Sequence, residues 1–285
     1  MSKSSAYRIV LFLLVIGISF SSSAQQLRII TAGSALTETV CALGDCDKII
    51  ASDRTSLYPA EIQKLPSIGY RSSINAEGIL GLKPTLIIAE KDYVDDAVLQ
   101  QLAGSGVKLL IVDRKYTFDD TRKLIQQIAT ALHREAEGKK LIAKIEGELA
   151  EARGMLKRAT TTPAAVCIYN RGTATVSVAG TNTFGEILPY VGATSAVKDI
   201  EGYKPLNTEA LIAANPDYLV MIDAGVQSLG GVDGVLKVPG VAQTTAGKKK
   251  QIVSLDSLML TNFGPRFGEA VKALVVLLHP ELQAK

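Results

Sequence analysis

The sequence has no tryptophan and only two histidines, His133 and His279, among its 285 residues. One histidine precedes a long charged segment and the other lies near the C-terminus, so we expect neither to reach a ligand cleft. A metal site built on several imidazoles therefore has too few ligands. The sequence also lacks the G-x-S-x-G, H-E-x-x-H and P-loop patterns of common enzyme classes. These absences favour a protein that is not an enzyme.

Strong charge of one sign is also missing. The formal net charge is +3 at pH 7, and no basic stripe of the kind that binds nucleic acid stands out. Lys248–Lys250 is the longest basic run, and we interpret it as a solvated turn before a strand. A nucleic-acid partner is therefore not expected.

The single long apolar run lies at the N-terminus. Lys3 and Arg8 come before the apolar residues Ile9–Ile18, and small residues follow as far as Ala24. This order is typical of a secretory signal peptide, and the run is too short for a stable membrane span. We predict cleavage after Ala24 and release of a monomer into the periplasm. No lipid anchor is expected, because no cysteine follows the run.

Three cysteines are few enough to consider one by one. Cys41 and Cys46 lie five residues apart, and the periplasm would permit a disulfide between them. Two unpaired thiols remain the alternative, because a bond also requires suitable Cα separation and direction. Cys167 lies in an apolar strand pattern and is expected in the core.

The length of the remaining chain and its alternation of apolar runs with helical patterns indicate two α/β domains. Removal of residues 1–24 leaves 261 residues (285 − 24), enough for two domains of about 120 residues each. From Leu27 onward, short apolar runs alternate with helical patterns at residues 75–82, 94–104 and 117–132. This alternation predicts α/β structure with a mostly parallel sheet.

Between His133 and Ala159 the composition changes, and the segment is charged, rich in alanine and free of proline. Its apolar residues recur at helical spacing along one stripe, namely Leu141, Ile145, Leu149, Ala152 and Leu156. We interpret the segment as a long helix joining two lobes, with an ordinary surface helix as the alternative. The predicted division is a signal peptide at 1–24, a first lobe at 25–132, a connecting helix at 133–162 and a second lobe at 163–285.

The second half repeats the order of the first. The segment ITAGSALTETVCALG contains a predicted strand, Ala-Gly, a hydroxyl N-cap at Ser34 and a predicted helix. The segment SVAGTNTFGEILPYVGA in the second half has the same order. Farther along, residues 67–88 and 202–220 both contain Gly-Tyr and a basic residue, followed by Asn, any residue, Glu and, seven residues after the Glu, Pro. We predict two Rossmann-like lobes with a ligand cleft between them, because open α/β sheets bind ligands beyond the carboxyl ends of their strands.

The two repeated tyrosines are the candidate ligands of that cleft. Tyr70 precedes Arg71, and Tyr203 precedes Lys204. A phenolate at pH 7 costs about 4 kcal/mol, which a neighbouring cation and a bond to Fe(III) can offset. Tyrosine is a known ligand of haem iron. The alternative is that both phenols are aromatic walls that stack on any ligand.

At these residues the chain resembles the periplasmic haem-binding proteins of bacterial haem ABC importers, within the cobalamin and ferric-siderophore binding-protein class. The resemblance covers the mature chain, and its most specific segment is LPSIGYR, which ends at Arg71. It implies two Rossmann-like lobes joined by a long helix, haem as the transported ligand, and Tyr70 as the axial ligand of the iron. It also implies that Glu77 and Glu209, one on each lobe, dock on a permease dimer. Without the resemblance, both glutamates are ordinary helix N-terminal charges.

The chain departs from its relatives at several basic positions. Ser72 stands where many relatives have arginine, and the second lobe has no histidine suited to the place where some relatives use one. The remaining candidates for binding the propionates or stabilising the phenolate are Arg71, Lys204 and Arg266, with Arg171 behind them. If neither repeated tyrosine binds iron, Tyr58 is the next to consider.

The leading hypothesis is a periplasmic haem-binding protein that delivers haem to an ABC permease. The same fold with a ferric siderophore or a cobalamin is the nearest alternative, and the absence of tryptophan favours haem. A secreted hydrolase or tetrapyrrole-processing enzyme and an adhesion module are the alternatives from other classes.

Overall fold

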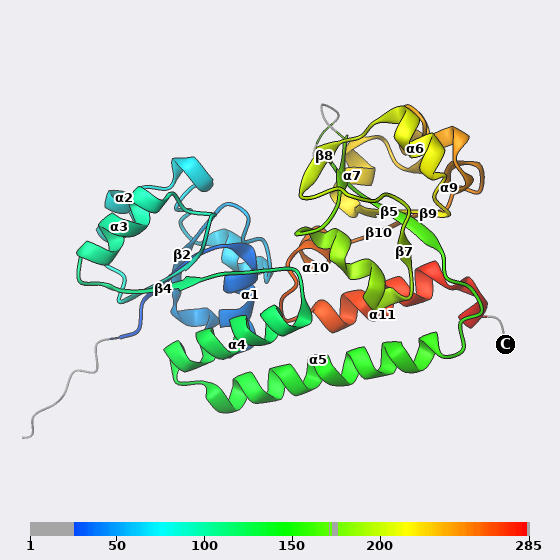
Figure 1. Cartoon of the computed structure of the whole chain (residues 1–285). Coiled ribbons are helices and arrows are strands. Elements are labelled where there is room, and N and C mark those ends of the chain that lie inside the picture. Colours follow the sequence, from blue (N-terminus) through cyan, green and yellow to red (C-terminus); the bar gives the residue numbers. More distant parts are fainter. Residues whose placement is uncertain (1–25, 171, 173–175, 284–285) are drawn as a thin grey trace, which may run out of the picture.

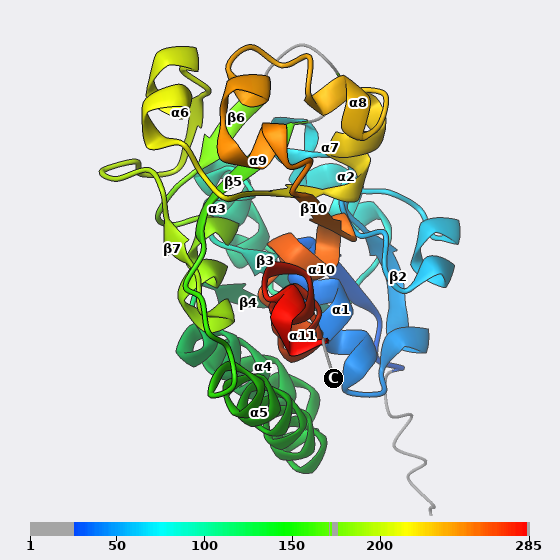
Figure 2. The same ribbon diagram turned by 90° about the vertical axis from the view of Figure 1, so that its right-hand side faces the viewer.

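The computed structural model describes residues 26–170, 172 and 176–283, and it contains two α/β lobes side by side (Figure 1). One sheet lies in each lobe, and helix α5 (Glu135–Leu156) runs along the base of both lobes (Figures 1 and 2). The predicted fold class is therefore confirmed. In the described part of the chain, no helix is both long and apolar enough to span a membrane.

The first lobe is built on a four-stranded sheet in the order β2-β1-β3-β4, and all of its strand pairs are parallel. Nearly every residue of its strands β1 and β3 is buried, as expected for a parallel sheet covered on both faces. The bounds are β1 Ile29–Ala32, α1 Ser34–Ala42, β2 Ile49–Ser52, α2 Ala76–Gly81, β3 Leu86–Glu90, α3 Asp96–Gly104, β4 Lys108–Val112 and α4 Phe118–Leu132, with short 3-10 helices η1 Cys46–Lys48, η2 Ala60–Lys64 and η3 Arg71–Ser73.

The second lobe has a mixed sheet in the order β10-β9-β5-β6-β8, with β7 pairing β5. Strands β5, β7, β9 and β10 are parallel, whereas β6 is antiparallel to β5 and β8. The bounds are β5 Ala164–Asn170, β6 Val176–Ala179, β7 Thr194–Ser195, β8 Tyr203–Pro205, α6 Thr208–Ala214, β9 Tyr218–Ile222, α7 Asp223–Ser228, α8 Val232–Val235, α9 Thr245–Lys248, β10 Ile252–Leu255, α10 Ser257–Thr261 and α11 Phe267–Leu278, with 3-10 helices η4 Phe184–Val191, η5 Val241–Gln243 and η6 Pro280–Leu282.

The antiparallel strands have a simple cause. Residues 171–175 between β5 and β6 are too few for a parallel crossover, which needs about a dozen residues or more. The second repeat also forms the 3-10 helix η4, with Pro189 inside it, where the first repeat forms the α-helix α1. The two lobes therefore share an order of elements without being copies of one another.

Helix α5 occupies the position predicted for the connecting segment. Its residues Ile145, Leu149 and Ala152 are buried, while Leu141 and Leu156 at the edges of the stripe are half-buried. The helix packs against both α4 and α11, which lie on the same side of it (Figure 1). The predicted division of the chain at residues 132 and 162 falls just outside the ends of α5 and remains a prediction.

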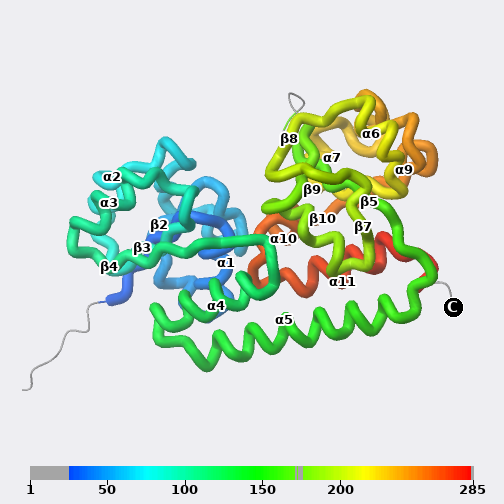
Figure 3. Tube along the Cα trace, in the orientation of Figure 1, coloured from blue at the N-terminus to red at the C-terminus, as the bar shows by residue number. Residues whose placement is uncertain are grey.

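A single apolar core continues from the first lobe into the second. It includes Leu36 of α1, Ile145 of α5 and Phe263, which follows α10. The chain around α10 lies where the two lobes meet (Figure 3). Because buried side chains join the lobes along this line, large independent motion of either lobe would expose apolar surface.

The predicted N-cap at Ser34 is wrong. Gly33 occupies the N-cap position of α1, without a side-chain cap, and Ser34 is the first helical residue. The Ser34 hydroxyl instead donates a hydrogen bond to Oδ1 of Asn262 in the second lobe, at 2.7 Å. The hydroxyl that the local sequence predicted as an N-cap therefore bonds a residue that is distant in the chain.

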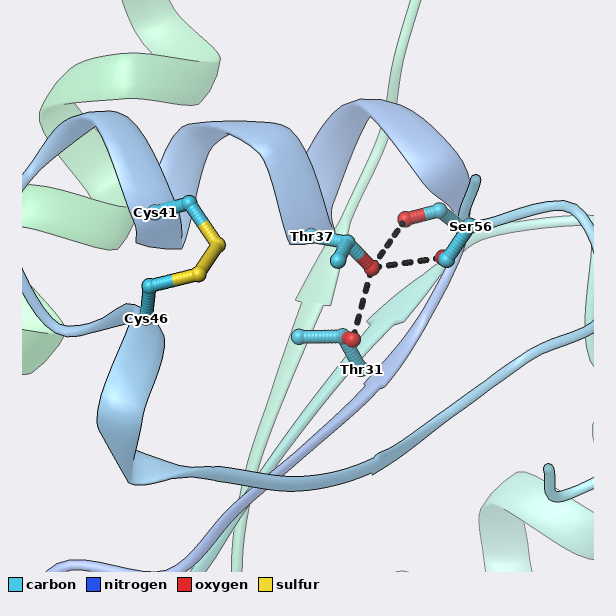
Figure 4. Close-up of a disulfide and its surroundings, with 6 residues drawn as sticks. Thr31, Thr37, Cys41, Cys46 and Ser56 are labelled. Atoms are coloured by element: carbon cyan, nitrogen blue, oxygen red, sulfur yellow. Dashed lines mark hydrogen bonds between the residues drawn. A yellow bond between two sulfur atoms is a disulfide. The ribbon is translucent and has the colours of Figure 1, made fainter. Parts of the chain in front are cut away.

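Cys41 and Cys46 form a disulfide at the C-terminal end of α1 (Figure 4). At the other end of the same helix, Thr37 contacts the hydroxyls of Thr31 and Ser56 at 2.7 and 2.6 Å. These contacts fix α1 against β1 and against the loop after β2. Cys167 is buried as a free thiol, as predicted.

Candidate functional site

A hollow of about 260 Å³ lies between the two lobes. Its lining residues follow the carboxyl ends of strands in both sheets, as the repeat predicted. The first lobe contributes Gly33, Ser34, Thr55, Tyr70, Arg71, Glu90, Tyr93, Arg114 and Tyr116, and the second contributes Tyr169, Tyr203, Leu258, Thr261 and Asn262. Five of the nine tyrosines of the sequence therefore meet in one cleft.

Several hollows are larger than this cleft, and two of them, of about 430 and 410 Å³, lie within single lobes. One is lined by the loop after β2, and the other by η4 and its neighbours. Neither gathers several aromatic side chains, and neither is lined by both lobes. The interlobe cleft is therefore the best candidate for the ligand site.

Tyr70 lies at the rim of this cleft, immediately before η3, and 40% of its surface is exposed. The Tyr70 N–H donates to Oγ of Ser73 at 2.7 Å, and that hydroxyl donates back to the Tyr70 carbonyl at 2.9 Å. Gly69 has a φ of 104°, and a Cβ there would meet the Ser73 hydroxyl at 2.7 Å. The glycine before the tyrosine thus allows the tight turn that presents the phenol.

Arg71 adopts a positive φ of 43°, and its Nε donates to the Tyr70 hydroxyl at 3.2 Å. Its guanidinium also lies 5.8 Å from the Tyr70 ring centroid and 5.1 Å from that of Tyr93. A positive group thus lies directly beside the phenol oxygen. An anionic form of that oxygen would gain a charge-assisted hydrogen bond.

Tyr203, the repeated tyrosine of the second lobe, lies on the opposite side of the cleft in β8. Its ring packs 5.0 Å from that of Tyr169 and 6.4 Å from that of Phe184. Burial raises the pKa of the Tyr203 phenol above its ordinary value. Lys204 is exposed and does not line the cleft, because adjacent residues of a strand point to opposite faces.

Arg266 lies outside the cleft, at a different hollow of about 300 Å³. Its guanidinium donates from Nε to Oε1 of Glu38 at 2.8 Å, and Glu38 is only 3% exposed. The same guanidinium stacks 3.8 Å from the ring centroid of Tyr58. Arg266 and Tyr58 thus join the second lobe to the first. The remaining candidate, Arg171, lies outside the described residues.

Sequence reasoning missed Arg114, which forms the floor of the cleft. Its guanidinium pairs with Glu90 at 2.9 Å and donates to the Asn262 carbonyl at 3.2 Å and to the Tyr116 hydroxyl at 3.3 Å. Burial opposes the positive charge, but Glu90 and Tyr116 together outweigh burial and raise the pKa of Arg114. In the sequence, the only indication of this role is the position of Arg114 just after the β-like run that ends at Val112.

Glu77 and Glu209 occupy equivalent positions outside the cleft. Each is the second residue of a helix, α2 or α6, and the N-cap of each helix is an asparagine. Both carboxylates are exposed, and neither makes an ion pair with any residue that the structure describes. Helices α2 and α6 lie on the side of the molecule away from α5 (Figures 1 and 2). The two glutamates therefore mark one face with one negative charge per lobe.

Comparison with known families decides the class of this two-lobed fold. Residues 29–258 match the sequence profile described as periplasmic binding protein. The chain belongs to this family. Proteins of the family are the substrate-binding components of ABC importers and are not enzymes, so the predicted absence of catalysis follows from membership.

Individual relatives of this binding protein show the range of ligands. The periplasmic heme-binding protein RhuT from Roseiflexus sp. RS-1 is 38% identical, with a TM-score of 0.85 over 90% of this chain and all of the other. The ABC transporter substrate-binding lipoprotein YvrC of Bacillus subtilis is 26% identical over 89% of this chain and 80% of its own length. The vitamin B12-binding protein of Pectobacterium atrosepticum is 33% identical over about half of each chain, 50% and 51%.

Proposed function

We propose that this periplasmic binding protein captures haem in the interlobe cleft and delivers it to an ABC permease. The observation that carries the proposal is the pairing of the Tyr70 phenol with the Arg71 guanidinium at the rim of an aromatic cleft. Tyrosinate is a good ligand for ferric iron, and the adjacent cation lowers the cost of its negative charge. Likeness to RhuT along nearly the whole chain supports the same ligand class.

Aromatic side chains line the cleft on both sides. Tyr70 and Tyr93 form one wall, and Tyr169 and Tyr203 form the other. The volume of about 260 Å³ lies below the ~300–1,000 Å³ typical of enclosed ligand sites. A macrocycle would therefore be held between the walls with one edge in solvent, where its carboxylates stay hydrated.

Arg71 is the cation that we assign to the bound ligand. The Arg114 guanidinium already bonds Glu90, Asn262 and Tyr116, so its charge is largely neutralised within the protein. Lys204 and Arg266 do not line the cleft. Propionates directed toward solvent need fewer protein cations, which accounts for a haem site with few basic residues.

A cobalamin or a ferric siderophore is the second candidate ligand, favoured by the likeness to the vitamin B12-binding protein. The tyrosine and arginine pair argues for iron, because a phenolate is a hard ligand that suits Fe(III). The spectra of the loaded proteins differ, since a haem complex shows a Soret band. The proposal also includes removal of residues 1–24 and a mature protein that is a monomer in the periplasm.

Titration of the ligand-free protein with hemin tests the proposal. We expect a saturable Soret change with a tyrosinate-to-iron charge-transfer band, and the endpoint gives the stoichiometry. Tyr70→Phe should abolish that band and release hemin more than about 100-fold faster, because even outer-shell partners of metal ligands contribute about 10- to 100-fold. Tyr203→Phe is the matched control and should retain the band.

The opposite result has a clear meaning. If Tyr203→Phe loses the band and Tyr70→Phe keeps it, the iron ligand belongs to the second lobe. If hemin does not saturate the wild-type protein while cyanocobalamin does, the haem proposal is wrong.

A further inference from the structure

Two phenols stand side by side on the first-lobe wall of the cleft. The rings of Tyr70 and Tyr93 meet edge to face, with centroids 6.1 Å apart and an interplanar angle of 83°. Both side chains line the hollow, so proximity alone does not decide which phenol faces the iron. Their hydroxyl groups, however, have partners of opposite charge.

The Tyr93 hydroxyl donates to Oδ2 of Asp53 at 2.6 Å. Asp53 is only 2% exposed and accepts four more hydrogen bonds, from the Gly33 N–H, the Ser56 hydroxyl, and the N–H and hydroxyl of Thr55. These donors follow the ends of β1 and β2, whereas Tyr93 follows β3. The Asp53 carboxylate is thus held rigidly, and it fixes the Tyr93 ring relative to three strand ends.

The Tyr93 ring in turn supports the exposed side chain of Arg71. The guanidinium lies 5.1 Å from the centroid of the Tyr93 ring, while its Nε donates to the Tyr70 hydroxyl at 3.2 Å. A solvent-exposed arginine has many rotamers, and an aromatic face beneath the guanidinium reduces that freedom. Tyr93 therefore acts on Tyr70 through Arg71.

We propose that Tyr93, anchored by Asp53, is a positioning residue that holds Arg71 against the Tyr70 phenol and so selects Tyr70 as the iron ligand. This inference rests on the proposed haem function. On binding, the Tyr70 oxygen loses its proton to solvent and forms the bond to Fe(III), while Arg71 stays protonated beside it. Tyr93 keeps its proton, because a second phenolate would face the Asp53 carboxylate.

The charge arrangement agrees with this division of roles. The Tyr93 hydroxyl faces the Asp53 carboxylate, to which it donates at 2.6 Å. Tyr70 has the opposite surroundings, with a guanidinium at its oxygen. In the part of the second lobe that the structure describes, Lys204 does not line the cleft beside Tyr203.

A double-mutant cycle on hemin release tests the inference. Arg71→Ala and Tyr93→Leu should each speed transfer of hemin to an excess of a haem-scavenging protein by on the order of tenfold. The double variant should be no faster than either single variant, because both remove the same support. Both single variants should also shift the tyrosinate-to-iron band in the same direction. A double variant about 100-fold faster than wild type, the product of the two effects, would overturn the positioning role.

Tyr93→Phe provides a second variant that keeps the ring and removes only the bond to Asp53. We expect Tyr93→Phe to speed hemin release less than Tyr93→Leu does. In the Arg71→Ala background, Tyr93→Phe should not speed release further. Tyr116→Phe removes another cleft hydroxyl, and its effect should multiply with that of Arg71→Ala. A wild-type protein without the tyrosinate band overturns both proposals. A normal band with multiplicative Tyr93 effects overturns only the role of Tyr93.

Discussion

At the scale of single residues, the two copies of the Gly-Tyr-basic motif have different environments. Arg71 follows Tyr70 in a tight turn and bends back to its phenol. Lys204 follows Tyr203 within a strand, where alternation directs the next side chain to the other face. The same three residue types thus produce a phenol with a cation in one lobe and a phenol among aromatic rings in the other.

The Tyr93–Asp53 bond predicts an alkaline loss of stability. The pKa of Tyr93 is raised in the folded protein, so the folded state holds its proton more tightly than the unfolded chain does. Stability from this group is complete below about pH 10 and falls as the pH rises further. In urea unfolding, Tyr93→Phe should be less stable than wild type at pH 7 by about 1.5–3 kcal/mol, the value of a hydrogen bond to a charged group. The difference should shrink above pH 10, and a constant difference up to pH 11 would contradict the assignment.

At the scale of elements, the two lobes are joined where helices α5 and α11 pack closely. Gly268 of α11 lies against Glu148 of α5, and a Cβ on Gly268 would stand 2.6 Å from the Glu148 Cβ and 3.2 Å from the Ile145 carbonyl. Ion pairs flank this contact, from Lys144 to Glu148 and to Glu269. The close approach therefore depends on a missing side chain in α11.

Substitution of two glycines separates close packing from helix propensity. Gly268→Ala should destabilise the protein by about 1–3 kcal/mol, because the added methyl group forces the helices apart. Gly147 is an exposed residue of α5 with open space at its Cβ position, so Gly147→Ala should stabilise by up to about 1 kcal/mol. Urea midpoints of the two variants measure the contrast. Equal effects of the same sign would mean that α11 does not pack tightly at Gly268.

At the scale of the whole molecule, the two lobes form one body with a face suited to a two-fold partner. Contacts of Asn262 with Ser34 and Glu38, and of Arg266 with Glu38, tie the second lobe to α1 of the first. Helices α2 and α6 carry Glu77 and Glu209 on the side away from α5. A permease dimer presents the same surface twice, which matches one carboxylate on each lobe.

Charge reversal tests this face independently of ligand binding. Glu77→Lys with Glu209→Lys should leave hemin titration unchanged, because neither residue lines the cleft. Uptake into vesicles that contain the permease should fall by about tenfold or more, since opposed like charges cost several kcal/mol at an interface. Glu135→Lys with Glu146→Lys on α5 makes the same change of charge on the other side and should transport normally. Normal uptake by the Glu77 and Glu209 variant would leave both residues as helix N-terminal charges only.

The sequence alone determined the features that depend on near neighbours. Apolar spacing predicted the helices at 76–81, 96–104 and 118–132 to within two residues, because each helix buries one face whatever lies opposite. It also predicted α5, although the predicted segment runs six residues beyond Leu156. The repeat predicted two α/β lobes and a cleft at the strand ends. Tyr70 was predicted to face the cleft because its segment lies between a strand and a helix, and it lines the hollow.

Only the tertiary structure decided which side chains share the cleft. Thr55, Tyr93, Arg114 and Tyr169 follow or end different strands, and no local pattern relates residues so far apart in sequence. Arg266 looked like a cleft cation, but the fold pairs it with buried Glu38. A parallel sheet gathers the ends of its strands at one edge, so the composition of that edge depends on strand order and register, which periodicity does not encode.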